Sequence, residues 1–210
     1  MSLTPGMRIG PYEVEELLAS GGMGEVYRCR DSRLARHVAI KILSAKAVPD
    51  PSRLERFFAE AKAVSSLNHP NILTLHEIGE SRAGPYLVTE LVDGATVREK
   101  LRQGPMAWRE AHDVALQSAS GLAKSHAAGI VHRDIKPENL MVTRDGLVKI
   151  LDFGLAKLVA SDIDALADSN MTSTGMIVGT PAYLAPERIR GSLRTHAATC
   201  SRWAWCCTKC

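Results

Sequence analysis

Two short motifs in the second half of the chain carry side chains suited to phosphoryl-transfer chemistry. The first is the run HRDIKPEN at residues 132–139, and the second is Asp152-Phe153-Gly154, with a turn at Asp145-Gly146 between them. Phosphoryl transfer needs a carboxylate to position the attacking hydroxyl and accept its proton, oxygen ligands for magnesium, and cations beside the phosphates. Chance does not readily produce both motifs at this separation, so these residues are the leading candidates for a catalytic site.

Each of these chemical requirements has a candidate residue. Asp134 can position and deprotonate a hydroxyl, Asn139 and Asp152 can offer oxygen ligands, and Lys136 and Lys41 can supply positive charge. Lys41 ends the apolar run VAIK, which reads as a buried strand, and a lysine that points into a cleft needs an anion beside it. The ordinary alternative for such a lysine is a surface position.

Glu60 is the natural carboxylate to orient Lys41. It lies in PSRLERFFAEAKAVSSL at residues 51–67, where apolar residues recur at spacings of three and four, as in an amphipathic helix. Taken by itself, Glu60 would more often be a solvated helix residue.

A glycine cluster precedes Lys41. Glycines 21, 22 and 24 lie between Leu18 and Val26, and such a cluster allows backbone N–H groups to approach phosphate oxygens. A plain hairpin turn explains the cluster equally well when it is taken alone. A dinucleotide-binding loop of the Rossmann type is disfavoured, because it needs a helix directly after the glycines, whereas residues 25–28 continue with a strand-like pattern.

The remaining pattern predicts the elements that must position these residues. Residues 9–43 alternate apolar and polar side chains as a strand meander, and strand-like stretches follow at 72–78 and 86–92. Five strands and the 51–67 helix would form a small first lobe. Asp93-Gly94 marks a hinge into a helical region, where apolar residues between Ala111 and Leu122 outline a second long helix that Gly129 closes.

Composition excludes several classes of function. The chain has 210 residues and a net charge of +3, from 26 Lys and Arg against 23 Asp and Glu, which is far from the basic character of a nucleic-acid-binding protein. No apolar run approaches the roughly 18 residues of a membrane span, and the first ten residues lack the apolar stretch of a signal peptide. We therefore expect a cytoplasmic protein with neither a nucleic-acid partner nor a membrane segment.

Residues 9–191 resemble a eukaryotic-type protein kinase, and LLASGGMGEVYR together with HRDIKPENLMV is similar to the bacterial Ser/Thr branch of that family. The resemblance implies an α+β, bilobal fold with ATP held between the lobes. The strand-rich N-lobe with one helix would span 9–92 after an N-terminal extension at 1–8. An incomplete helical C-lobe with the catalytic and activation loops would span 93–191, followed by an aberrant tail at 192–210.

The resemblance also implies a role for each matching residue. The adenine would be covered from above by Leu18, Val26 and Ala39 and from below by Met141. Thr89 would guard the back of the pocket. Glu90 and Val92 would offer hinge backbone groups to the adenine edge. Lys41, paired with Glu60, would hold the α- and β-phosphates, Asp134 would be the catalytic base, and Asn139 and Asp152 would bind Mg²⁺. The implied nucleotide-contacting set is Leu18, Ala19, Gly21, Gly22, Gly24, Val26, Ala39, Lys41, Thr89, Glu90, Val92 and Met141.

Lys136 is typical of family members that phosphorylate Ser or Thr in proteins, and Gly179-Thr180-Pro181 agrees. The segment between Asp152 and Glu187 resembles an activation loop. We predict that it is regulated by self-phosphorylation at Thr172, Ser173 or Thr174, with Arg133 gripping the phosphate. The alternative is a Ser/Thr-rich loop that is never modified.

Two features depart from the family. Ala19 stands where the family has the first glycine of its phosphate loop. We expect this difference to weaken ATP binding at most. If the backbone at this position needs a positive φ, an alanine there would be strained. After Gly191 the composition changes, because residues 188–210 contain no acid, two of the three tryptophans and four of the five cysteines.

A frame change explains the tail. Codons that encode residues 194–210 can be chosen so that the same nucleotides, translated from the third base onward, encode DARSDLFALGVVLYEM. This peptide resembles the expected kinase continuation. The alternatives are a cysteine-rich tail and a zinc site using Cys207 and Cys210 with His196, Cys200 or Cys206, although the well-spaced ligand pairs of zinc sites are missing. Losing the rest of the C-lobe should impair activity and favour aggregation. The rival to an active kinase is therefore an inactive nucleotide-binding or interaction fragment.

Overall fold

The computed structural model describes residues 3–22, 24–44 and 51–153. The described residues divide into two compact units, one formed by those up to residue 66 together with 74–91, and the other by residues 67–73 and 92–153. The short segment 67–73 thus belongs to the second unit although residues of the first unit flank it on both sides.

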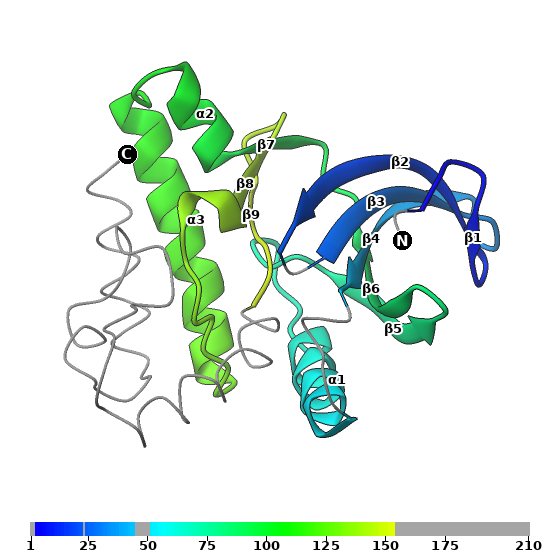
Figure 1. The fold of residues 1–210 in the computed structure, drawn as a ribbon. Coiled ribbons are helices and arrows are strands. Elements are labelled where there is room, and N and C mark those ends of the chain that lie inside the picture. Colours follow the sequence, from blue (N-terminus) through cyan, green and yellow to red (C-terminus); the bar gives the residue numbers. More distant parts are fainter. Residues whose placement is uncertain (1–2, 23, 45–50, 154–210) are drawn as a thin grey trace, which may run out of the picture. The chain divides into compact units, whose positions relative to one another are not determined.

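The first unit is built on a six-stranded antiparallel sheet, shown in blue to green in Figure 1. The strands follow the order β1-β2-β3-β4-β6-β5, so only the last two exchange places relative to the sequence. Their bounds are β1 Arg8–Ile9, β2 Tyr12–Gly21, β3 Gly24–Asp31, β4 Arg36–Leu43, β5 Leu75–Ser81 and β6 Gly84–Glu90.

The core of the first unit lies on one face of this sheet. Val38, Ile40 and Ile42 alternate along β4 and are buried together with Tyr27 and Cys29 of β3, as the two-residue period of a strand requires. Burial raises the pKa of the Cys29 thiol to about 12. This cysteine is therefore a protonated core residue and not a nucleophile.

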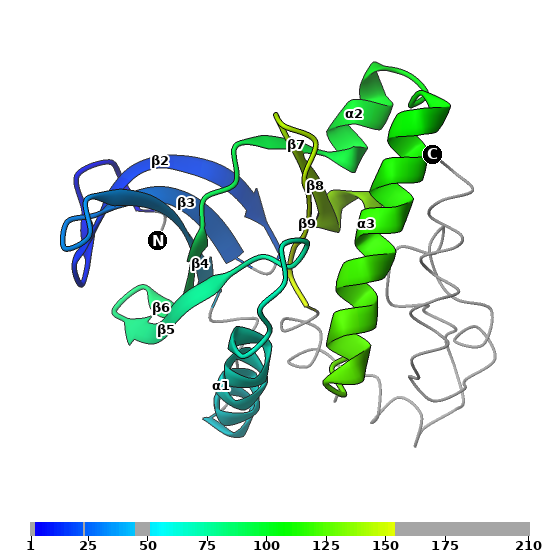
Figure 2. The same cartoon turned by 180° about the vertical axis from the view of Figure 1, so that it is seen from behind.

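Helix α1, Pro51–Ser65, packs against β5 in the same unit (Figure 2). Phe57, Ala61 and Val64 are its buried side chains, and their spacing of four and three residues places them on one helix face. The amphipathic helix expected over 51–67 is confirmed, with an end two residues earlier than predicted.

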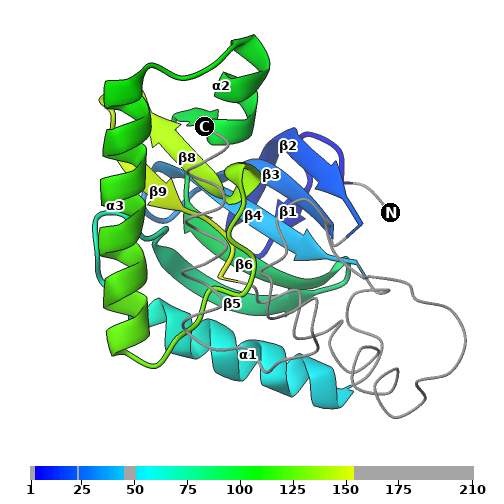
Figure 3. The same cartoon turned by 90° about the vertical axis from the view of Figure 1, so that its left-hand side faces the viewer.

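The second unit contains a three-stranded antiparallel sheet in the order β7-β8-β9. The elements are β7 Gly94–Thr96, α2 Val97–Gln103, α3 Trp108–Ala127, a 3-10 turn at Pro137–Asn139, β8 Leu140–Thr143 and β9 Val148–Ile150. Helix α3 runs beside β8 and β9 (Figure 3). A Cβ on Gly121 would lie 2.7 Å from Cδ1 of Ile150, so this glycine permits the close approach of α3 to β9.

One long element matches its expected bounds closely, and one strand begins later than expected. The long second helix is confirmed, and Gly129 adopts a φ of +75° just beyond its end. The strand expected over 72–78 begins only at Leu75, because Ile72 and Leu73 belong to the second unit and pair with β9 of that same unit. Among the described residues, no helix combines the length and apolar character needed to cross a membrane.

Candidate active site

The glycine cluster forms the turn between β2 and β3, where Gly21 and Gly24 face each other across the hairpin. Gly24 has a φ of +140°, and a Cβ there would lie 1.9 Å from the carbonyl oxygen of Ile42 on β4. A Cβ on Gly21 or Gly22 would meet no atom within 4 Å. Of these three glycines, Gly24 is therefore the one that the backbone requires.

Ala19 lies inside β2, opposite Val26 of β3. The non-glycine residues with positive φ in the described part of the chain are Ala35, Arg133 and Asp152. Ala19 is not among them, so the backbone strain considered for this departure from the family does not arise. Its backbone continues the pairing of the hairpin.

Strand register brings several of the expected nucleotide-contacting residues to one face of the sheet. Val26 is opposite Ala19 on one side and Lys41 on the other, and Ala39 is opposite Thr89. Directly opposed residues and residues two apart along a strand share a face. These five side chains therefore lie on the face opposite the buried core of Val38, Ile40 and Ile42.

Glu60 lies on α1, in the same unit as Lys41. Both residues take part in further interactions, and their pairing with each other stays a prediction. Leu18 is about half exposed, beside the irregularity between Leu17 and Ala19 in the β2–β3 register.

The end of β6 is anchored to Thr74. The Glu90 N–H donates to the Thr74 carbonyl at 3.0 Å, and the Glu90 carboxylate accepts the Thr74 N–H at 2.7 Å. The backbone N–H of Glu90 is therefore already engaged within the first unit. Val92, the other expected hinge residue, belongs to the second unit, and Met141 lies in β8 of that unit.

The HRDIKPEN motif forms a compact hydrogen-bonded loop around Asp134. Asp134 and Asn139 are buried, with 7% and 8% of their surface exposed. Asn139 Nδ2 donates to the Asp134 carbonyl at 2.8 Å and to its Oδ2 at 3.2 Å. Lys136 Nζ lies 3.1 Å from the same Oδ2. The structure thus brings these three expected site residues together around one carboxylate.

His132 joins this loop to the chain before Asp152. Its Nε2 lies 2.7 Å from the Leu151 carbonyl and must donate to it, while Nδ1 accepts the Asp134 N–H at 3.3 Å. The neutral imidazole protonated on Nε2 satisfies both contacts. Its ring also packs on Phe153, with ring centroids 4.8 Å apart.

Two non-glycine residues of these motifs have left-handed backbone conformations, Arg133 with a φ of +64° and Asp152 with a φ of +44°. Each costs on the order of 1–3 kcal/mol, which the surrounding contacts must offset. The contacts of His132 and a hydrogen bond from the Leu151 N–H to the Asn139 carbonyl at 2.9 Å hold both segments.

The chemistry of Asn139 and Asp152 fits a magnesium ion. Because Asn139 Nδ2 is engaged as a donor, its carboxamide oxygen is the atom that can ligate a cation. No group of three or more His, Cys, Asp or Glu residues within the described ranges could hold a metal. Two protein oxygens suit magnesium, which usually takes its other ligands from water and substrate phosphates.

One supporting contact of the loop was not expected from the sequence. Arg98 Nε, on α2, lies 2.8 Å from Oε1 of Glu138 inside the HRDIKPEN motif. The two residues are separated by 40 positions, and nothing in the local sequence pattern around either one signals the pair.

Comparisons with known proteins find a matching family, similar sequences and similar folds. The family model of the protein kinase domain matches residues 12–209. The serine/threonine-protein kinase PknA of Mycobacterium tuberculosis is 45% identical over 188 residues, which is 87% of this chain and 42% of that protein. PknB of Mycobacterium leprae is 41% identical over 194 residues, which is 90% of this chain and 30% of that protein. The chain thus spans less than half the length of these relatives.

Solved structures show the same fold. A crystal structure of the Mycobacterium tuberculosis PknI kinase domain has a TM-score of 0.74 at 25% identity, covering 98% of this chain and 76% of that one. A crystal structure of Rad53 in complex with AMP-PNP has a TM-score of 0.71 at 25% identity, covering 93% of this chain and 46% of that one. The expected α+β fold and the resemblance to bacterial Ser/Thr kinases are confirmed.

Proposed function

Because the chain belongs to the protein kinase family, we propose that it transfers the γ-phosphoryl group of ATP to Ser or Thr hydroxyls of proteins in a magnesium-dependent reaction. The observation that carries this proposal is the loop in which Lys136 and Asn139 both contact the carboxylate of Asp134. The named Ser/Thr kinases among the relatives and the AMP-PNP bound to Rad53 support the choice of substrates.

Asp134 receives the substrate hydroxyl in this proposal. An oxygen–phosphorus bond forms between that hydroxyl and the γ-phosphorus, the bond from the γ-phosphorus to ADP breaks, and the hydroxyl proton passes to the Asp134 carboxylate. The Asn139 amide fixes the orientation of the carboxylate, and Lys136 balances its charge and stays within reach of the transferred group.

The other site residues bind and orient. Asn139 and Asp152 would hold Mg²⁺, which neutralises phosphate charge when bound. Lys41, oriented by Glu60, would hold the α- and β-phosphates. The expected nucleotide contacts come from the sheet face of Ala19, Val26, Ala39 and Thr89 and from Leu18, Gly21, Gly22, Gly24, Glu90, Val92 and Met141.

A phosphotransfer assay with the purified chain, MgATP and a generic Ser/Thr protein substrate tests the proposal. Asp134→Asn should lower kcat by roughly 10²- to 10⁴-fold, because it removes the proton acceptor, while MgATP should still raise the thermal unfolding midpoint. Equal rates for the two proteins would refute the role of Asp134.

The tail at residues 192–210 favours a second candidate, an inactive nucleotide-binding or interaction fragment, since it lacks any acidic residue. MgATP stabilisation of the wild-type chain with no phosphotransfer above that of Asp134→Asn would favour this candidate.

We also propose that Thr172, Ser173 or Thr174 is self-phosphorylated. All three lie outside the described residues. Mass spectrometry of peptides after incubation with MgATP should find phosphate on this stretch in the wild-type chain and none in Asp134→Asn. An unmodified stretch in an active enzyme would contradict the proposal.

A further inference from the structure

The segment between α1 and β5 is bonded to the strand that leads to Asp152. The Ile150 N–H donates to the Asn71 carbonyl at 2.8 Å, and the Leu73 N–H donates to the Ile150 carbonyl at 3.1 Å. Ile72 forms a parallel bridge with Ile150. Segment 67–73 therefore extends the β7-β8-β9 sheet along β9.

Gln117 of α3 makes three hydrogen bonds to this junction. Its Oε1 accepts from Asn71 Nδ2 and from the Val148 N–H, each at 2.9 Å. Its Nε2 donates to the Gly146 carbonyl at 3.0 Å. One carboxamide thus joins the segment after α1, the start of β9 and the turn before β9.

Asn71 completes the junction from the other side. Only 5% of its surface is exposed, and its Nδ2 also donates to the Val148 carbonyl at 2.9 Å. An apolar side chain at residue 117 would leave this buried carboxamide and the Val148 N–H short of a partner, which costs about 1–3 kcal/mol for each orphaned group.

A second contact ties the same segment to α3. His69 Nδ1 accepts the Asn71 N–H at 3.1 Å, and its Nε2 lies 3.2 Å from the Ser120 hydroxyl. Gln117 and Ser120 are three residues apart and therefore neighbours on one face of α3. Segment 67–73 is held at two points along a single helix.

We propose that Gln117 is a positioning residue for phosphate binding. The strand that it holds, β9, ends at Ile150, and Leu151 then leads to Asp152. Gln117 thereby fixes the stretch of chain that carries a proposed magnesium ligand. Its effect on nucleotide binding rests on the function proposed above.

The test compares the affinities of the full chain for MgATP and for adenosine, since adenosine lacks phosphates. Gln117→Leu should weaken MgATP binding about tenfold, as expected for the loss of about one net hydrogen bond, and leave adenosine binding unchanged. Gln117→Glu keeps both acceptor contacts and should fall between wild type and Gln117→Leu. Leu116→Ala, at an exposed neighbouring position, should match wild type.

Hydrogen exchange tests the junction independently of the chemistry. The Leu73, Val148 and Ile150 amides should exchange about tenfold faster in Gln117→Leu. Asn71→Ala combined with Gln117→Leu should add little further effect, because both act through one junction. Unchanged exchange, equal weakening of both ligands, or a wild-type chain that binds no MgATP would each overturn the inference. MgATP binding without phosphotransfer would instead refute the proposed function and leave this inference supported if the affinity ratio changes.

Discussion

At the scale of single residues, the three glycines of the β2–β3 turn differ in whether the structure requires a glycine at that position. Gly24→Ala places a methyl group against the Ile42 carbonyl in a left-handed backbone region. We expect it to lower the free energy of unfolding by at least about 1–3 kcal/mol, the range of backbone strain alone, and to weaken MgATP binding. Urea denaturation and calorimetric titration would measure both effects.

Gly21→Ala is the matched control for this prediction, because a Cβ there meets open space. It should leave the urea midpoint close to that of the wild type. If the two alanine variants were equally stable, the requirement at Gly24 would be wrong.

Tyr12 gives the chain a pH dependence at the alkaline end. Burial, followed by a hydrogen bond to Glu77, raises the pKa of its phenol to about 12, whereas an unfolded tyrosine has a pKa of about 10. Above pH 10 the unfolded chain loses this proton while the folded chain keeps it. The stabilisation is therefore full below pH 10 and is lost as the pH rises toward 12.

Denaturant unfolding between pH 9 and 12 would measure this dependence. Tyr12→Phe should be less stable at pH 8, because it loses the contacts with Glu77 and Arg33, and its stability should fall less steeply above pH 10. Tyr86, whose pKa burial and Glu77 also raise, should supply the remaining slope. An unchanged slope in Tyr12→Phe would contradict the assignment.

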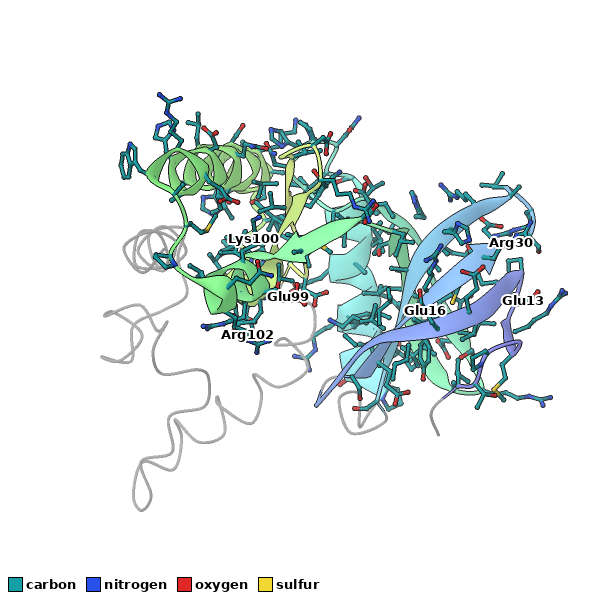
Figure 4. The ribbon with its side chains drawn as sticks, turned by 90° about the horizontal axis from the view of Figure 1, so that it is seen from above. Glu13, Glu16, Arg30, Glu99, Lys100 and Arg102 are labelled. Carbon is teal, nitrogen blue, oxygen red and sulfur yellow. The ribbon has the colours of Figure 1, made fainter. Side chains whose placement is uncertain are left out.

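At the scale of elements, helix α2 is fixed at its start by a capping box. The Glu99 N–H donates to Thr96 Oγ1 at 3.1 Å, and the Thr96 N–H donates to Glu99 Oε2 at 2.7 Å. Figure 4 labels Glu99 and the neighbouring charged residues Lys100 and Arg102 on this helix. The cap sets where α2 begins and so supports Arg98, which contacts Glu138.

Removing this cap should destabilise the chain modestly. Thr96→Ala should cost about 1 kcal/mol in urea denaturation, whereas Gln103→Ala, at the exposed end of the same helix, should cost little. The hydrogen bonds from Thr96 lower the pKa of Glu99. Its stabilisation is therefore present above the unfolded pKa of about 4.3 and lost as the pH falls through the folded value. A Thr96→Ala penalty that persists in full at pH 2 would contradict this account.

At the scale of the whole molecule, the change in composition after Gly191 is the reason for the frame-change hypothesis. The nucleotide sequence of the gene can test it. Residues 192–210 lie outside the described residues, and the family match runs to residue 209. The coding sequence should show codons that read DARSDLFALGVVLYEM in the shifted frame.

A chain carrying that continuation should aggregate less and show higher kcat than the present one, as light scattering and phosphotransfer rates would show. Equal behaviour of the two chains would contradict the importance of the tail.

The sequence by itself determined the family and most of the elements, and it indicated the candidate site residues. Asp134, Asn139 and Lys136 lie within six residues of one another, so a local loop can bring them together. Alternation in β2 to β4 and the three- and four-residue spacing in α1 report burial directly, because each element has a fixed side-chain period. The resemblance to Ser/Thr kinases likewise rests on contiguous runs of residues, LLASGGMGEVYR and HRDIKPENLMV.

Tertiary structure alone decided what depends on distant partners. Gly24 is required because β4 passes beside it, Ala19 is unstrained because β2 stays extended, and segment 67–73 leaves the first unit because β9 supplies its hydrogen bonds. Asn71 meets Gln117 across 46 positions and Val148 across 77. A hydrogen bond between residues so far apart has no periodic signature in sequence, since only the folded chain brings its donor and acceptor within reach.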